Sequence, residues 1–96
     1  MHAVAVRYEL RIPHSRSLKE KRRVLRPLID GLRHRLKVSV AEVDHQDTWQ
    51  RAAVAVALVA SSAVQLDELR ARVDRLVDTA PDMELLDVQI AWPEPA

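Results

Sequence analysis

The sequence predicts an α+β fold in which two helices cover one face of a four-stranded antiparallel sheet. Four segments alternate apolar and polar residues or are short and rich in valine, as strands are. Two longer segments repeat leucine and valine every three or four residues, as amphipathic helices do. Because the order is strand, helix, strand, strand, helix, strand, right-handed crossovers give the βαββαβ, or ferredoxin-like, arrangement.

The length of 96 residues suits a single domain, which we expect over residues 1–92 with a loose tail over 93–96. There is no phenylalanine, so leucine, valine and alanine must form the core. The absence of cysteine excludes disulfides and thiolate metal sites and suits a reducing cytoplasm, where we expect this protein. The first residues are too charged for a signal peptide, and we expect neither a membrane span nor a cofactor.

The first half of the fold is one strand and one long helix. A strand is expected over residues 3–12, where alternate side chains are apolar. A helix is expected over residues 17–36, with Ser17 and Glu20 spaced as a capping box. Pro27 lies opposite the apolar face, so it should bend the helix without disturbing the core. The apolar face consists of Leu18, Leu25, Leu28, Ile29, Leu32 and Leu36.

The second half begins with a hairpin. Strands are expected over residues 37–43 and 51–60. Val43 is out of phase with Val38 and Val40, which indicates either a bulge or a fraying strand end near residues 41–42. A second helix, capped by Ser62, is expected over residues 61–80, and a last strand over 84–92. The side chains expected to face inward from that strand are Leu86, Val88, Ile90 and Trp92.

The charge is unevenly distributed although the net charge is only +1. Residues 1–51 contain twelve Lys and Arg against six acids, whereas residues 52–96 contain three against eight. On the first helix, basic residues share one flank, and like charges stand four apart, which is mildly destabilising. We interpret this flank either as a phosphate-binding surface or as a solvated face beside the acidic second helix. The candidate nucleic-acid-binding residues are Lys19, Lys21, Arg22, Arg23 and Arg26.

The loop between the two hairpin strands is the second candidate site. Acids and a histidine there could ligate a metal or act in acid–base chemistry, but no spaced partner completes a metal motif, so no metal site is expected. Asp44 and Asp47 also suit Asx turns, and Trp49 can fold its ring over the end of the core. The residues expected to shape the loop or contact a partner are Asp44, His45, Gln46, Asp47, Trp49 and Arg51.

The sheet face opposite the helices is expected to be lined with alanines and to carry no aromatic side chain. It therefore offers no platform for stacking RNA bases. Its small residues would allow another sheet to approach closely, so a homodimer through this face is a second possibility. Exposed alanines are also ordinary on a protein surface.

The stretches "RSLKEKR", residues 16–22, and "VSVAEVDHQDTWQR", residues 38–51, resemble the hallmark runs of the YlxP-like family of small bacterial proteins. Arg16 replaces a histidine common in that family, and Thr48 replaces a leucine. The resemblance implies a ferredoxin-like fold. It also implies a role near RNA or ribosome maturation, because such proteins are often encoded beside ribosome-binding factor A. The resemblance implies no catalytic residues, so we do not expect this protein to be an enzyme.

We therefore expect a cytoplasmic module that binds RNA or a ribosomal subunit through the basic first helix and the hairpin loop. The alternative is a protein-interaction module that dimerises through the open sheet face without nucleic acid.

Overall fold

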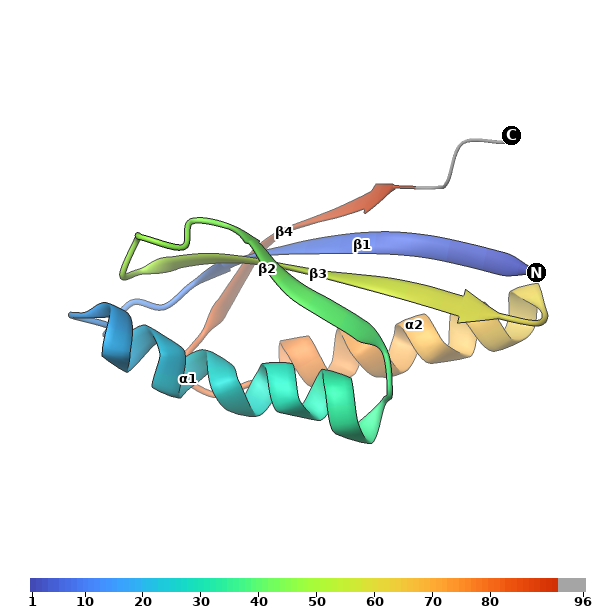
Figure 1. Cartoon of the computed structure of the whole chain (residues 1–96), viewed down its shortest axis with the longest axis horizontal. Helices are drawn as coiled ribbons and strands as arrows, with labels where there is room; N and C mark the ends of the chain where they lie inside the picture. Colours follow the sequence, from blue (N-terminus) through green and yellow to red (C-terminus); the bar gives the residue numbers. More distant parts are fainter. Residues whose placement is uncertain (92–96) are drawn as a thin grey trace.

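The computed structural model describes residues 1–91 and shows one sheet with both helices on the same side (Figure 1). Its elements are β1 (His2–Arg11), α1 (Leu18–Asp30), η1 (Gly31–Arg35), β2 (Ser39–Asp44), β3 (Arg51–Ala60), α2 (Ala63–Asp78) and β4 (Glu84–Ala91). The four strands are ordered β2-β3-β1-β4 and all neighbours are antiparallel. The predicted α+β, ferredoxin-like fold is confirmed. The tail over 93–96 and the inward position predicted for Trp92 lie outside the described residues.

The core lies between the helices and the two central strands. Alternate residues of β1 point toward the helices, and Val6 and Tyr8 have no exposed surface. Fully burying such a side chain contributes about 1.5–3 kcal/mol. The Tyr8 hydroxyl donates a hydrogen bond to Asp74 of α2. Burial and this carboxylate together raise the pKa of Tyr8. The other large core side chains are Val4, Leu10, Ile12, Leu25, Leu28, Leu32, Val38, Val54, Val56, Leu58, Leu66, Val73 and Val77.

Helix α1 begins at the predicted cap and changes its winding near its end. The Glu20 N–H donates to Ser17 Oγ at 3.0 Å, and the Glu20 carboxylate accepts from the Arg16 N–H at 2.6 Å. Pro27 is exposed, as predicted, but the last turn is a π-helix, η1, closed by a 3.1 Å bond from Leu36 N–H to Gly31 O. A Cβ at Gly31 would lie 3.1 Å from Leu76 of α2, so glycine allows close helix packing. Within residues 1–91 no helix is long and apolar enough to cross a bilayer.

The predicted bulge is present in β2 and lies at Val43, slightly later than expected. Glu42 is opposite Val54 and Asp44 is opposite Ala53, so Val43 is the extra residue. Because side chains alternate along a strand, the extra residue allows Glu42 to face the helices and Asp44 to face the open side of the sheet. The bulge thus distributes two acids between the two faces.

The prediction that β4 packs into the core is corrected by the structure. Val88 and Ile90 pair with Tyr8 and Val6 and so lie on the helix side, but they are 36% and 42% exposed. Leu86 is the extra residue where the β1–β4 register shifts, and it is 46% exposed. The buried core draws its side chains from β1, β3 and the helices, and the apolar face of β4 stays largely open.

Two valines of β3 test the division of the sheet into a core face and an open face. Val54 has no exposed surface, whereas Val59 is 62% exposed. We expect Val54→Ala to lower the free energy of unfolding by about 2–3 kcal/mol, because it removes buried methyl groups and leaves a cavity. Val59→Ala should change it by less than about 0.5 kcal/mol. Urea unfolding of both variants measures this, and equal costs would contradict the assignment of faces.

Candidate functional site

The β2–β3 loop has a fixed conformation set by backbone contacts. His45 has a φ of 62°, a left-handed conformation that is unusual for a residue other than glycine. The Thr48 N–H donates to His45 O at 3.0 Å and closes a turn. Asp44 Oδ1 accepts from the His45 N–H at 2.8 Å. The predicted Asx turn would bond two residues on, so at Asp44 this prediction is corrected to a bond with the next residue.

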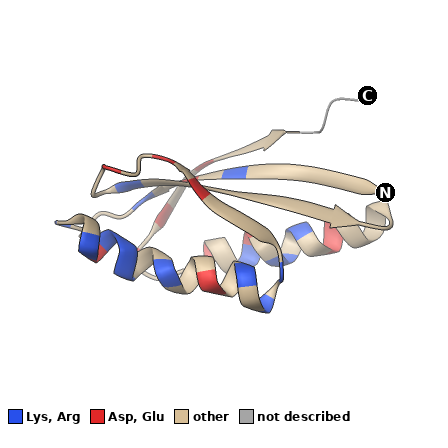
Figure 2. Cartoon of the chain, viewed as in Figure 1, with Lys and Arg blue, Asp and Glu red and all other residues tan. Residues whose placement is uncertain are grey.

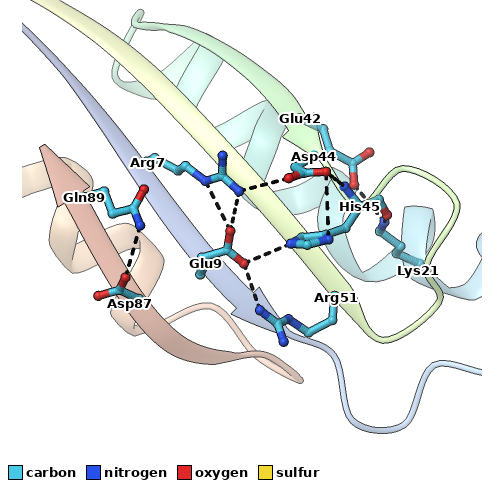
Figure 3. A network of polar contacts seen from close by, with 9 residues as sticks. All are labelled: Arg7, Glu9, Lys21, Glu42, Asp44, His45, Arg51, Asp87 and Gln89. Atoms are coloured by element: carbon cyan, nitrogen blue, oxygen red, sulfur yellow. Dashed lines mark hydrogen bonds and ion pairs between the residues drawn. The ribbon is translucent and has the colours of Figure 1, made fainter. Parts of the chain in front are cut away.

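Lys21 is a buried link between α1 and this loop. Its side chain is 2% exposed, and its ammonium donates to His45 O at 2.6 Å (Figure 3). The same Nζ lies 2.8 Å from Glu42 Oε2, an oxygen that is buried and makes no aligned hydrogen bond. The ammonium charge therefore balances the carboxylate. The prediction that Lys21 contacts phosphate is wrong for this conformation, because its ammonium is enclosed and already engaged.

The sequence contains a signal for this ion pair. Lys21 stands three residues after Leu18 and four before Leu25, which places it on the apolar face of the helix. Glu42 is in phase with the inward valines Val38 and Val40 of its strand. Two opposite charges, each on the buried face of its element, indicate a buried pair, since an unpaired buried charge is very costly.

A second group of charges lies on the open side of the sheet and centres on Glu9, which is only 9% exposed (Figure 3). Arg7 donates to Glu9 Oε1 through Nε at 3.1 Å and Nη2 at 2.6 Å. Arg51 Nη2 donates to Glu9 Oε2 at 3.0 Å, and His45 Nε2 lies 3.2 Å from the same oxygen. Arg7 also reaches Asp44 Oδ2 at 3.2 Å. We call Arg7, Glu9, Asp44, His45 and Arg51 the open-face network.

These contacts favour the ionised carboxylates. The hydrogen bond from Arg7 lowers the pKa of Glu9 most, and burial opposes this, while Arg51 and His45 assist. The His45 backbone N–H, followed by Arg7, lowers the pKa of Asp44. Hydrogen bonds to Glu9 and then Asp44 raise the pKa of Arg7. The positive and negative charges of the network therefore balance, and its contacts hold the loop against the sheet.

The geometry of the network does not suit a metal ion. Glu9 approaches Nε2 of the His45 ring, whereas Asp44 lies 3.9 Å from Nδ1, so the two carboxylates meet different ring nitrogens. Arginine side chains occupy the carboxylate oxygens instead. Within residues 1–91 no three His, Asp or Glu side chains are grouped as a metal site requires.

The remaining loop residues predicted as contacts are exposed. Gln46 and Asp47 face solvent, with a 3.4 Å contact from Gln46 Nε2 to Glu42 O. Trp49 is 53% exposed and does not belong to the core, so the prediction that its ring covers the core end is wrong. Gln50, which was not predicted, ties the loop to the segment before α1 through a 3.2 Å bond from its amide to Ser15 O.

The outer flank of α1 is a row of exposed cations, visible as the blue bands along this helix in Figure 2. We call this row the basic flank: Lys19, Arg22, Arg23 and Arg26. In the part of the chain that the structure describes, none of the four has a carboxylate within ion-pair distance. An open depression along this flank is lined by these four cations together with Ser17, Glu20, Pro27 and Asp30. The structure thus brings together four of the five predicted basic residues.

Exchanging the buried ammonium tests the link between α1 and the loop. We expect Lys21→Met to lower the free energy of unfolding by about 3–5 kcal/mol, because it leaves Glu42 charged and unpaired. Lys19→Met is the matched control on the exposed side of the same helix and should cost less than about 0.5 kcal/mol. Chemical denaturation measures both. A Lys21→Met cost as small as that of the control would show that the pair does not hold the loop.

The open-face network predicts a loss of stability in acid. The folded-state pKa values of Glu9 and Asp44 lie below their unfolded values, so this stability is fully present above about pH 5. It is lost as the pH falls through the folded-state values, below about pH 4. We expect Glu9→Gln to flatten this part of the stability profile, measured by denaturation between about pH 3 and pH 7. An equally steep acid loss in the variant would contradict the role of Glu9.

Comparison with known proteins agrees with this description. A family model described as "Protein of unknown function (DUF503)" matches residues 4–90. An uncharacterised protein YlxP of Bacillus subtilis (strain 168) is 38% identical over 76 residues, which cover 79% of this chain and 83% of that protein.

Two designed proteins share the fold alone. Foldit4 has a TM-score of 0.60, 14% identity and coverage of 96% of this chain and 99% of that one. LFR1 1, described as having a ferredoxin fold, has a TM-score of 0.57, 8% identity and coverage of 100% and 90%. The chain therefore belongs to the DUF503 family.

Proposed function

We propose that this protein is an RNA- or ribosome-associated binding module that uses the basic flank of α1 as its phosphate-binding surface. The observation that supports this most is the row of four exposed cations without carboxylate partners among residues 1–91. A surface of this kind attracts a polyanion and releases counterions when the polyanion binds.

The four-residue spacing of cations along the basic flank is a second reason to propose phosphate binding there. Lys19 and Arg23 stand four residues apart on one helix, as do Arg22 and Arg26, so each pair repels mildly. Within residues 1–91, Glu20 and Asp30 line the same depression but form no ion pair with these cations. Phosphates placed along the flank would relieve this repulsion and gain attraction at the same time.

The hairpin loop would extend the same surface. Figure 1 shows the β2–β3 loop at the same end of the molecule as the start of α1, and Lys21 joins the two directly. Trp49 is 53% exposed, which makes its ring available for stacking on an unpaired base. Gln46 offers an exposed amide for base edges. The loop would then contribute base contacts while the flank holds phosphates.

The open sheet face is less suited to this role. RNA-recognition modules of this topology stack bases on aromatic side chains of the sheet. Here β1 and β3 present alanines and Val59 at one end of that face and the open-face network at the other. In the network, Arg7 and Arg51 already bind Glu9.

A salt titration of RNA binding tests the proposal. The probe is a single-stranded RNA of mixed sequence, with fluorescence anisotropy as the readout. Four phosphate contacts predict a log–log slope of about −3. Arg22→Gln together with Arg26→Gln should weaken binding and reduce the slope by about 1.4. The matched control is Arg72→Gln with Arg75→Gln, which removes two exposed arginines from α2.

The control variant should retain wild-type affinity and slope. No salt-dependent affinity for the RNA, or equal losses in both double variants, would contradict a phosphate site on α1. Trp49→Ala should weaken binding without changing the slope, because stacking on a ring releases no counterions.

The alanine-lined half of the open sheet face supports a second candidate, a homodimer through that face. The favouring observation is Val59, which is 62% exposed beside small, flat neighbours. Light scattering of the wild type and Val59→Lys tests it. A dimer that Val59→Lys dissociates supports this candidate, and a dimer that it leaves intact contradicts it.

A further inference from the structure

Strand β4 carries more exposed apolar surface than any other strand of the described chain. Of its eight residues, four are large hydrophobics with 36–46% of their surface exposed: Leu85, Leu86, Val88 and Ile90. The helices cover mainly the central strands and leave the helix side of β4 open. An edge strand of this composition is a pairing site unless it is protected.

The two edges of the sheet differ in their protection. Strand β2 is six residues long, and its bulge at Val43 breaks the regular edge. Strand β4 also has a bulge, at Leu86, but residues 87–91 pair with β1 in unbroken register. Their outer backbone groups have no partner within residues 1–91. A regular segment of five residues with a free edge is therefore available only on β4 among the described edges.

We propose that a second copy of this chain pairs antiparallel with β4 along this edge and continues the sheet across a two-fold axis. Such an interface is isologous, so the strand must be complementary to itself. Placing the axis at Gln89, the middle of the regular segment, puts Val88 opposite Ile90 of the partner strand on the helix side. It puts Asp87 opposite an alanine, so no like charges meet.

Other registers are less favourable. An axis at Asp87 would place two carboxylates directly opposite each other, which destabilises antiparallel pairs. An axis at Val88 would require Leu86, the bulged residue, to pair regularly. An axis between two residues would bring Val88 opposite Gln89 and exchange the two faces of the partner sheet. The axis at Gln89 avoids the facing carboxylates, the pairing of the bulged Leu86 and the exchange of faces, so it is the favoured register.

The pairing has a consequence for the whole assembly. An antiparallel continuation relates the copies by an axis perpendicular to the sheet, so both helix layers lie on the same face. Helix α1 lies on the side of β2, where its arginines and Glu42 line one depression, and β2 is the edge opposite β4. The two basic flanks would then lie near the two ends of one continuous sheet. Pairing along β4 does not require RNA binding.

Sedimentation of the wild type and three variants tests the edge. The short interface predicts a concentration-dependent dimer, because it is smaller than obligate interfaces. Val88→Lys and Ile90→Lys place charges in the pairing and should raise the dimer dissociation constant at least tenfold. Both sites are already partly exposed, so the monomer should remain folded by circular dichroism. Val59→Lys, on the open face, is the matched control and should dimerise like the wild type.

Cysteine cross-linking tests the register. The chain has no cysteine, so a single introduced thiol reports its own position. Under mild oxidation, Gln89→Cys should form a disulfide-linked dimer, because the two Gln89 positions face each other at the axis. The bond forms by loss of two electrons and two protons from the two thiols to the added oxidant. Val88→Cys should cross-link at least tenfold more slowly.

A monomer at all concentrations up to about 1 mM would overturn the proposal. A dimer dissociated by Val59→Lys but not by Val88→Lys would also overturn it and would support the open-face dimer instead. Faster cross-linking at Val88 than at Gln89 would overturn the register.

Discussion

The buried ammonium of Lys21 is the contact on which the hairpin's conformation depends. A lysine on the apolar face of a helix can be buried only if its charge is balanced and its protons find acceptors. Glu42 supplies the charge, and the backbone oxygen of His45 supplies an acceptor at 2.6 Å. This fixes the start of the loop beside α1 and supports the left-handed His45 backbone. From there the imidazole reaches Glu9 on the opposite side of the sheet. The two stretches that resemble the family's hallmark runs thus meet at this lysine.

Much of the fold could be predicted from apolar residues that repeat every 2 positions along strands and every 3.6 positions along helices. The features that could not be predicted in this way are set by contacts between elements. Alternation along β1 and the Ser17 cap predicted their structures correctly. The bulge was predicted because Val43 breaks phase, but its effect, turning Asp44 toward Arg7, needs the register with β3. Trp49 was misplaced because its size suggested burial, whereas the described loop leaves it half open. The open apolar face of β4 was missed since periodicity indicates which side a residue faces, not whether a helix covers it.

The charged residues of the candidate site fall into two groups: some form ion pairs within the protein, and others are exposed to solvent. In the run from Lys19 to Arg23, Lys21 faces the interior and its basic neighbours face solvent. A count of basic residues therefore overstates the proposed phosphate-binding surface, which consists of the four exposed cations of the basic flank. On the other side of the sheet, arginines of comparable charge are neutralised by Glu9 and Asp44. One helix flank stays available to a polyanion, and the open-face network stabilises the loop beside it.

A double-mutant cycle of Lys21→Met and Glu9→Gln tests this account most directly. The two side chains lie on opposite faces of the sheet and share no direct contact, so they can influence each other only through the loop that both hold. The account predicts that the two losses in unfolding free energy are not additive, with a coupling of about 0.5 kcal/mol or more. Strict additivity within error would show that the buried lysine and the open-face network act independently, and it would contradict the central role given to Lys21.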